Sequence, residues 1–234
     1  MIKLLTVEDY KRYQEGMNKT LYKINEDLDL ALHIYHCDNA FVFEEAQITK
    51  DDIVLDIGCG AGSSSVQAAY FARKVIGMDR ECHHKEYGEY KAKGIDNVCF
   101  DCPQEATRLE YPNNYFDKII SISALEHNNQ EDRIKIMKEC ARVLKPGGTV
   151  TMSVGVGKNY ILDDVQISDM IHDAKLVQAA PSLTKWHINW HVPYLVGWQM
   201  VRNDLYEKTY QDWMDFLGYD QGWIPCGFKA IKEK

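Results

Sequence analysis

The amino-acid sequence predicts an α/β fold, in which a mostly parallel sheet carries helices on both faces. The first observation is that short apolar runs alternate with amphipathic stretches from Asp52 to about residue 154, as strands and helices do in right-handed βαβ units. The second is a glycine-rich turn at residues 58–62, placed between a buried strand and a helix. Ligands of open α/β sheets bind at such turns, beyond the carboxyl ends of the strands.

The first 47 residues are predicted to be helical and to form a cap on this core. They contain few helix-breaking residues, and their aromatic and aliphatic side chains recur at roughly helical spacing. Within the core, residues 48–154, Gly94 is a natural stop for a helix, and Lys145-Pro146-Gly147-Gly148 forms a tight turn before the last strand. The expected core elements are strands at 53–57, 74–79, 97–101, 116–122 and 149–154 and helices at 63–73, 80–93 and 131–144.

The regular alternation stops after the core, which predicts an insertion at 155–201. This insertion begins with a polar helical stretch at 163–178 and continues into an aromatic segment. The C-terminal part, residues 202–234, is expected to hold a helix at 203–217, closed by Gly218, and a final strand or hairpin. The length of 234 residues suits one domain made of these four parts.

Composition and charge exclude several classes of function. The net charge is −8, so general binding to nucleic acid is not expected. No run of about 18 apolar residues and no secretory signal is present, so neither a transmembrane helix nor membrane insertion is expected. The seven cysteines are scattered and odd in number, which favours free thiols in a reducing compartment and therefore a cytoplasmic protein. The sequence does not indicate an oligomeric state.

The glycine-rich turn carries the strongest functional signal. Its glycines follow the spacing GxGxG, with Asp56 two residues before the first of them, whereas a dinucleotide-binding dehydrogenase more typically shows GxGxxG. Asp79 ends the second strand, where a carboxylate can accept both hydroxyls of a ribose, and Asp101 ends the third, where one can accept from an adenine amino group. Three acidic strand ends around one crevice suit an adenosine without pyrophosphate, because phosphates favour cations or a free helix N-terminus.

Four ordered sequence blocks within residues 53–154 identify a family resemblance. They read VLDIGCGAGSSS, VIGMDR, FDCPQEATRLEYPNNYFDKIISISALEH and RVLKPGGTV. In order and approximate spacing they resemble the class I S-adenosylmethionine-dependent methyltransferases, in particular the small-molecule branch. The resemblance implies a Rossmann-like sheet of seven strands, the last one antiparallel, and S-adenosylmethionine as the cofactor.

The resemblance also implies a role for individual residues. The aspartate and glycines of the turn would lie against the methionine half of the cofactor, although Asp56 also fits a purely structural role as a cap of the turn. Asp79 would bind the ribose, and Asp101 the adenine. Cys102 departs from the many relatives that have alanine there. The implied cofactor-binding residues are Asp56, Gly58, Gly60, Gly62, Asp79, Asp101, Cys102, Ser121 and Ile122.

Methyl transfer from a sulfonium is an in-line displacement, so the protein must mainly orient the acceptor, which contributes roughly 7–11 kcal/mol. No metal is required, and a general base is needed only when the acceptor is protonated at neutral pH. His127, which follows the fourth strand, is one candidate, although it also fits a structural role. His187 and His191 are the others; their i, i+4 spacing suits a metal, but no Glu or Cys completes a ligand pattern, so no metal is expected.

An aromatic stripe in the insertion predicts either a lid over the acceptor or a helix packed on the core. Its side chains lie four residues apart along the chain, which places them on one helical face, and loops at the carboxyl ends of strands commonly carry specificity. The N-terminal tyrosines, Tyr10, Tyr13 and Tyr22, are the alternative wall. The members of the stripe are Trp186, Trp190, Tyr194 and Trp198.

The sequence therefore predicts a methyltransferase that acts on oxygen or nitrogen, and less favourably on carbon or sulfur, of a small-molecule acceptor. A protein or RNA methyltransferase is the first alternative, but the acidic charge disfavours RNA and no NPPY tetrapeptide is present. A non-catalytic cofactor-binding or scaffold protein is disfavoured because Asp79 and Asp101 accompany an intact glycine turn. The glycine spacing disfavours a nicotinamide-dependent oxidoreductase.

Overall fold

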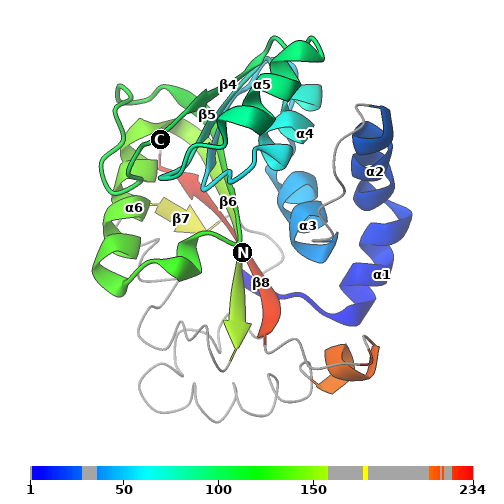
Figure 1. Ribbon diagram of the computed structural model, residues 1–234. Coiled ribbons are helices and arrows are strands. Elements are labelled where there is room, and N and C mark those ends of the chain that lie inside the picture. The colour runs from blue at the N-terminus through cyan, green and yellow to red at the C-terminus, as the bar shows by residue number, and fades with distance from the viewer. Residues whose placement is uncertain are drawn as a thin grey trace.

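The computed structural model describes residues 2–27, 36–157, 176–178, 211–216, 218 and 223–233. A twisted sheet runs through the molecule with helices against it (Figure 1). The helices are α1 (Val7–Glu15), α2 (Met17–Asp27), α3 (His36–Ala46), α4 (Ser63–Phe71), α5 (His84–Ala92), the 3-10 helix η1 (Leu125–His127), α6 (Gln130–Val143) and a short turn of helix at 211–216. The strands are β1 (Ile2–Leu4), β2 (Ile53–Ile57), β3 (Lys74–Met78), β4 (Val98–Asp101), β5 (Phe116–Ile122), β6 (Leu144–Gly157), β7 (Leu176–Gln178) and β8 (Trp223–Lys232).

The order of the strands confirms the predicted α/β fold. Along the sheet the order is β4-β3-β2-β5-β6-β8-β1, and the five strands from β4 to β6 are parallel. The last long strand, β8, is antiparallel to β6 over nine residue pairs, from Thr149–Ile231 to Gly157–Trp223. The five core strands and the antiparallel C-terminal strand therefore lie in the predicted places, but β6 begins at Leu144 and includes residues 145–148, which were expected to form a turn before the strand.

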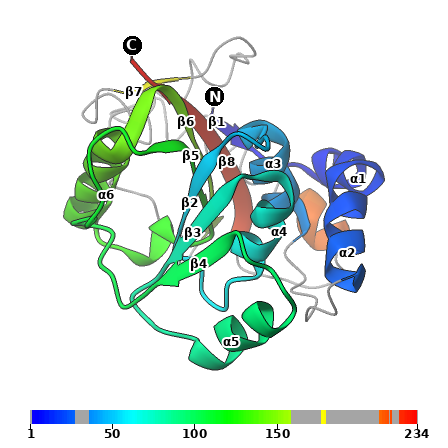
Figure 2. The same ribbon diagram turned by 90° about the horizontal axis from the view of Figure 1, so that it is seen from above.

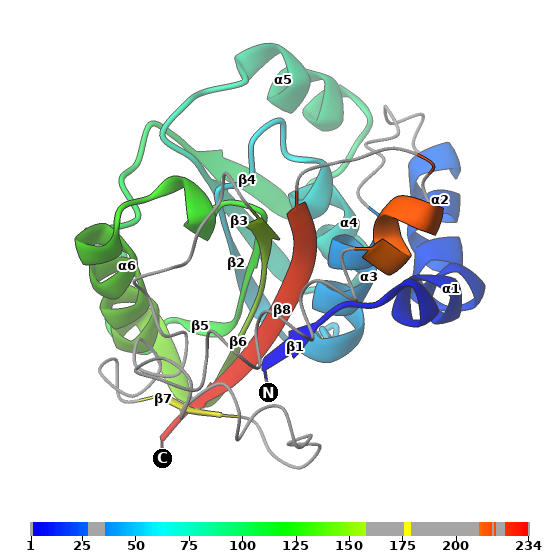
Figure 3. The ribbon, with the colours of Figure 1, turned by 90° about the horizontal axis from the view of Figure 1, so that it is seen from below.

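The outer edge of β8 corrects the predicted number of strands. Two three-residue strands pair with this edge, β1 opposite Cys226–Phe228 and β7 opposite Ala230–Lys232, so the described sheet has eight strands and not seven (Figure 3). Both lie in stretches predicted as helical, residues 1–47 and 163–178; residues 163–175 of the second stretch lie outside the described residues. The physical reason is that the unpaired N–H and C=O groups of an edge strand need partners, which outweighs local helix propensity.

Helices cover both faces of the sheet, as predicted. Helices α3 and α4 lie on one face and α6 on the other, while α1 and α2 form an outer layer against α3 (Figure 2). Phe41 of α3 is fully buried, and its ring lies so close to Gly227 of β8 that a Cβ there would overlap it. The face of the sheet that α3 covers thus requires a glycine in β8.

The ends of the helices follow their capping residues. Thr6 and Asp9 form a reciprocal capping box that starts α1. Gly94 and Gly218 adopt the left-handed conformation (φ 76° and 75°), which confirms them as helix stops. Helix α5 begins at His84, four residues later than predicted, because the preceding loop turns back on Asp79. None of the helices in the described ranges is long and apolar enough to cross a membrane.

Candidate active site

A cavity of about 250 Å³ opens at the carboxyl ends of the central strands, where ligands of open α/β sheets bind. Its walls come from the ends of β2, β3 and β5, from the loop after β4 and from η1. The lining residues are Ile57, Gly58, Met78, Asp79, Arg80, Gln104, Glu105, Ala106, Thr107, Ser121, Ser123, Ala124, Leu125, His127, Asn128, Ile136 and Met152.

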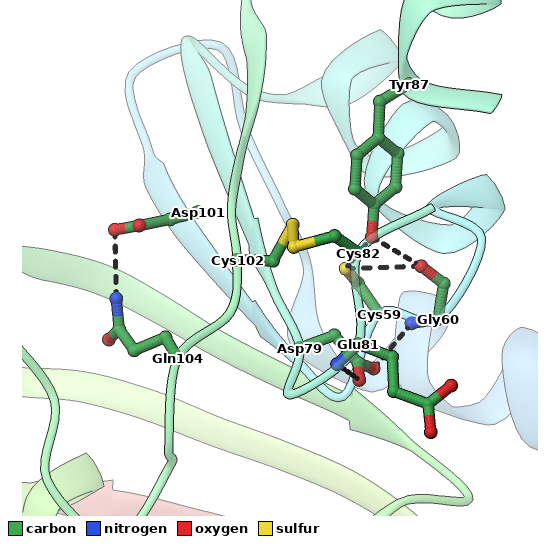
Figure 4. The surroundings of a disulfide bond; sticks show 9 residues. All are labelled: Cys59, Gly60, Asp79, Glu81, Cys82, Tyr87, Asp101, Cys102 and Gln104. Carbon is green, nitrogen blue, oxygen red and sulfur yellow. Dashed lines mark hydrogen bonds between the residues drawn. A yellow bond between two sulfur atoms is a disulfide. The ribbon is translucent and has the colours of Figure 1, made fainter. Parts of the chain in front are cut away.

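Asp79 lines this cavity and is held from two sides. Its Oδ2 accepts the backbone N–H of Gly60 at 2.9 Å, and its Oδ1 accepts that of Glu81 at 3.0 Å (Figure 4). Since each carboxylate oxygen has a second lone pair, both oxygens can still accept a hydrogen bond from a ligand. The carboxylate that the sequence predicts to bind a ribose is therefore fixed between the glycine turn and the loop after β3.

The glycine turn needs its glycines for two different reasons. Gly58, Gly60 and Gly62 all have positive φ, at 72°, 51° and 86°. A Cβ at Gly58 would overlap the Cβ of Ala124, so the side chain of Ala124 already fills the space beside this glycine. A Cβ at Gly60 would meet no described atom within 4 Å. The space over Gly60 is thus open to a ligand, whereas Gly58 allows close packing of the turn against the loop after β5.

Asp56 lies beneath the turn and not in the cavity wall. It is 1% exposed, and its Oδ2 accepts the hydroxyls of Ser64 at 2.7 Å and Ser65 at 2.6 Å, both in the first turn of α4. Burial raises the pKa of this carboxyl to about 6, although the two hydroxyls favour its charged form. Its Oδ1 is buried and has no hydrogen-bond partner among the described residues. The capping role is therefore present, and the carboxylate lies buried beneath the glycine turn.

The predicted adenine residues lie beside the cavity, and the loop after β4 forms the wall. Asp101 is exposed, and its Oδ2 accepts Gln104 Nε2 and Tyr111 Oη, each at 2.9 Å. Gln104 does line the cavity, and its backbone N–H donates to the carbonyl of Asp79 at 2.9 Å. Figure 4 shows the side chain of Gln104 directed toward Asp101, with their hydrogen bond marked. A hydrogen bond thus connects the loop after β4 directly to Asp79 at the end of β3.

Cys102 corrects the expectation that all cysteines are free. It forms a disulfide with Cys82, across a Cα–Cα distance of 5.4 Å (Figure 4). Neighbouring parallel strands place their carboxyl ends side by side, here Met78 next to Asp101, so two cysteines 20 residues apart meet in the loops that follow. Among the described residues, Cys59, Cys99, Cys140 and Cys226 are not part of a disulfide.

Ser121 and His127 lie in the cavity wall at the end of β5 and in η1. Ser121 is buried and donates to the carbonyl of Ile57 at 2.8 Å, which links β5 to β2. His127 is exposed at the end of η1. Ile122, at the end of β5, is partly buried and does not line the cavity. Gly62 caps α4 and packs on Phe100.

Most acceptor-side candidates lie outside the described residues, and the N-terminal tyrosines lie within them. Tyr22 lies in α2, partly buried, Tyr13 is buried in the core, and Tyr10 packs its ring edge-on against Trp213. None of these tyrosines lines the cavity. In the described ranges, no group of three His, Cys, Asp or Glu side chains could hold a metal. His187, His191, Trp186, Trp190, Tyr194 and Trp198 lie outside the described residues and stay predictions.

Several residues of the cavity wall are not predicted from the sequence. Gln104, Glu105 and Thr107 belong to the third sequence block, in which the resemblance implies cofactor-binding roles only for Asp101, Cys102, Ser121 and Ile122. The signal available was the distance of three to six residues beyond Asp101, which keeps a loop at the same end of the sheet. Ser123 is a fourth wall residue of this kind, and it directly follows Ser121 and Ile122, for which the resemblance implies cofactor binding.

The fold is that of class I methyltransferases, with five parallel strands and an antiparallel C-terminal strand. Residues 54–148 match the family model described as "Methyltransferase domain". The crystal structure of the YcgJ protein from Bacillus subtilis superposes with a TM-score of 0.57 at 20% identity, over 86% of this chain and 100% of that one.

Curated enzymes are similar in sequence. The sterol 4-C-methyltransferase strm-1 of Caenorhabditis elegans is 29% identical over 191 residues, 79% of this chain and 55% of that enzyme. The ubiquinone biosynthesis O-methyltransferase of Proteus mirabilis is 29% identical over 185 residues, 74% of this chain and 69% of that enzyme. The chain spans only 39% to 55% of the length of four curated methyltransferases that it matches.

The resemblance predicted from the four sequence blocks is thus confirmed. Residues 54–148 match a methyltransferase domain, and the curated enzymes similar to this chain are methyltransferases.

Proposed function

We propose that this protein transfers a methyl group from S-adenosylmethionine to an oxygen or nitrogen atom of a small-molecule acceptor. The observation that carries the proposal is the position of Asp79: its carboxylate lines the cavity and is fixed by the N–H groups of Gly60 and Glu81. A preorganised carboxylate beside an open glycine turn suits a ribose diol next to a part of the ligand that must approach the backbone closely.

The residues present fit the proposed cofactor. Asp79 would hold the ribose, and Asp56, whose buried Oδ1 has no hydrogen-bond partner among the described residues, would place negative charge beneath the turn for the ammonium group of the methionine half. The loop from Gln104 to Thr107 would cover the adenine, with Asp101 and Cys102 behind it. Asp56 and Asp79 together suit a ligand that carries a sulfonium and an ammonium group and no phosphate.

The chain would contribute mainly orientation and exclusion of water. When bound, the cofactor supplies the methyl carbon, whose bond to sulfur breaks as a lone pair of the acceptor attacks it. Orientation of the acceptor accounts for roughly 7–11 kcal/mol of such a barrier. His127 lines the cavity, which supports it as a candidate base. His187 and His191 stay candidates for the same role, and the aromatic stripe stays a candidate lid.

The division of the chain remains part of the proposal. Residues 48–154 would bind the cofactor and residues 155–201 would cover the acceptor, with residues 1–47 as a cap and residues 202–234 completing the sheet. Relatives named for sterols and for ubiquinone biosynthesis support a small-molecule acceptor. The charge of −8 supports an acceptor other than nucleic acid. A cytoplasmic location is also proposed. Cysteines in a reducing compartment are expected to be thiols, so the Cys82–Cys102 disulfide would be an exception there.

Calorimetric titration with S-adenosylhomocysteine tests the proposal. We expect the intact protein to bind this product with a dissociation constant in the micromolar range. Titration with a nicotinamide dinucleotide under the same conditions is the comparison, and we expect no heat of binding. Binding of the dinucleotide without binding of S-adenosylhomocysteine would replace the methyltransferase by the oxidoreductase alternative.

A further inference from the structure

Ser123 occupies an unusual position in the cavity wall. It follows β5 directly and lines the cavity, with a backbone φ of 49° that residues other than glycine seldom adopt. Its N–H donates to the carbonyl of Ser153 in β6 at 3.1 Å, which holds the backbone in that conformation. A non-glycine residue held in the left-handed region at a cavity wall indicates that the direction of its side chain matters.

The side chain of Ser123 donates to a carboxylate that lies behind the wall. Its Oγ is 3.1 Å from Asp38 Oδ2, across 85 residues of sequence. Asp38 is the third residue of α3, whose C-terminal end precedes β2, so its N-terminal end reaches the carboxyl ends of the strands. Asp38 is 3% exposed and does not line the cavity. Any contact of Asp38 with a ligand in this cavity therefore passes through the Ser123 hydroxyl.

The surroundings of Asp38 favour uptake of a proton. Glu126 of η1 is the charged group that acts on Asp38 among the described residues, and it is also negative. Glu126 is itself buried, accepts the N–H of Gly155 at 2.8 Å, and has Arg133 of α6 near it. Burial, with a smaller contribution from Glu126, raises the pKa of Asp38 to about 7, against the opposing hydrogen bond from Ser123.

We infer that Ser123 and Asp38 form a proton relay for the acceptor. An acceptor O–H or N–H in the cavity donates its proton to Ser123 Oγ, and the proton already on Ser123 passes along the existing hydrogen bond to Asp38 Oδ2. The acceptor loses one proton, Asp38 gains one, and Ser123 ends unchanged. This inference rests on the proposed function, and it deepens that function by selecting acceptors that must lose a proton, such as alcohols, phenols and protonated amines. Ser123 is then the catalytic residue, and Asp38 is a positioning residue that acts through it.

The first test needs no acceptor. In protein with ¹³C-labelled aspartate and bound S-adenosylhomocysteine, the carboxyl resonance lost in Asp38→Asn should titrate with a midpoint near 7. Because the Ser123 hydroxyl favours the charged carboxylate, Ser123→Ala should move this midpoint upward. A resonance that stays ionised across the neutral range, or a midpoint that Ser123→Ala leaves in place, would overturn the relay.

The second test uses two phenols as acceptor probes, phenol, which is protonated at neutral pH, and pentafluorophenol, which is ionised. We expect Asp38→Asn and Ser123→Ala to lower kcat/KM for phenol by about 10²–10⁴-fold and to remove its rise with pH through 7, while pentafluorophenol is affected far less. Equal losses for both phenols would overturn the relay in favour of a structural role, and a loss only in His127→Ala would assign the base to His127.

Two controls separate this inference from the proposed function. Asp96→Asn, at an exposed position before β4, should change neither the carboxyl midpoint nor kcat/KM. Both relay variants should keep the wild-type affinity for S-adenosylhomocysteine; if the wild type itself does not bind it, the proposed function fails before the relay is tested. If neither phenol is methylated, the carboxyl titration alone decides.

Discussion

The proposed cofactor side and the proposed acceptor side of the cavity are built in different ways. On the cofactor side, Asp56 bonds to hydroxyls 8 and 9 residues away, and Asp79 to an N–H 19 residues away. On the acceptor side, Ser123 bonds to Asp38 across 85 residues, and Glu126 to Gly155 across 29. Short-range bonds leave a compact motif in the sequence, whereas bonds between distant elements leave none. The cofactor side is therefore the part of the site that the sequence identifies.

The two sides also differ in how they treat buried acids. The Asp56 carboxylate is held by two hydroxyls, but Asp38 receives one hydroxyl and faces another acid. The pKa of both is raised by burial, to about 6 for Asp56 and about 7 for Asp38. Acids with pKa values perturbed by burial and a neighbouring like charge are common at functional sites, which supports the role proposed for Asp38.

The variant with the largest expected effect on the cofactor side is Gly58→Ala. The added Cβ would overlap Ala124, and the positive φ disfavours alanine, so we expect a loss of about 3 kcal/mol in the free energy of unfolding. Chemical denaturation measures it. Gly60→Ala is the matched variant: its Cβ meets no described atom, so stability should fall by about 1 kcal/mol while affinity for S-adenosylhomocysteine drops. Equal losses of stability would contradict the different roles of the two glycines.

Asp79→Ala should weaken binding of S-adenosylhomocysteine by about 100-fold. The change removes the carboxylate proposed to accept the ribose hydroxyls, and hydrogen bonds to charged groups contribute about 1.5–3 kcal/mol each. Isothermal calorimetry gives the dissociation constant, with Asp96→Ala as the control at an exposed aspartate outside the cavity. An affinity within a factor of three of the wild type would remove Asp79 from the cofactor site.

Asp38→Asn should stabilise the protein above pH 7, by about 2 kcal/mol. Folding raises the pKa of Asp38 from 3.8 to about 7. Between these two pH values, the folded protein keeps a proton on Asp38 that the unfolded chain has released. The contribution of Asp38 to stability therefore falls as pH rises from about 4 to 7 and levels off above that. Urea denaturation at a pH on either side of the window measures it. A variant that is less stable than wild type at the higher pH would contradict the buried-acid interpretation.

Reduction of the Cys82–Cys102 disulfide should have the smallest effect. The disulfide joins the loops after β3 and β4, which both contribute to the cavity wall, so its loss should weaken binding of S-adenosylhomocysteine by less than tenfold through greater freedom of the loops. Calorimetry with and without a thiol reductant measures this, with the double variant of both cysteines to serine as the control for the reductant itself. A loss comparable to that in Asp79→Ala would mean that the disulfide shapes the site directly.

The sequence predicts the core of the fold well, because apolar runs and glycine stops act locally. Strands β2 and β5 have their predicted bounds, and Gly94 and Gly218 end their helices as expected. The short strands β1 and β7 were missed because they depend on the edge of β8, which forms only in the assembled sheet. The late start of α5 depends on the hydrogen bond that the Glu81 N–H donates to the Asp79 carboxylate.

In the candidate site, too, residues in local motifs are predictable from the sequence, and residues that meet through distant contacts are not. Asp79, Gly58 and Ser121 lie in the cavity wall, where their motifs place them. Asp38 lies in a helix without any motif, and no pattern relates it to Ser123. The left-handed backbone of Ser123 is equally invisible, since serine carries no preference for it. The disulfide was missed because cysteines 20 residues apart meet only through the pairing of β3 with β4.

A crystal structure with S-adenosylhomocysteine bound tests the central claim most directly. The account predicts that both ribose hydroxyls donate to the Asp79 carboxylate, that the adenine lies against the loop from Gln104 to Thr107, and that the sulfur faces Ser121 and Ser123. A ligand bound away from the carboxyl ends of β2 and β3, or a ribose that does not contact Asp79, would contradict it.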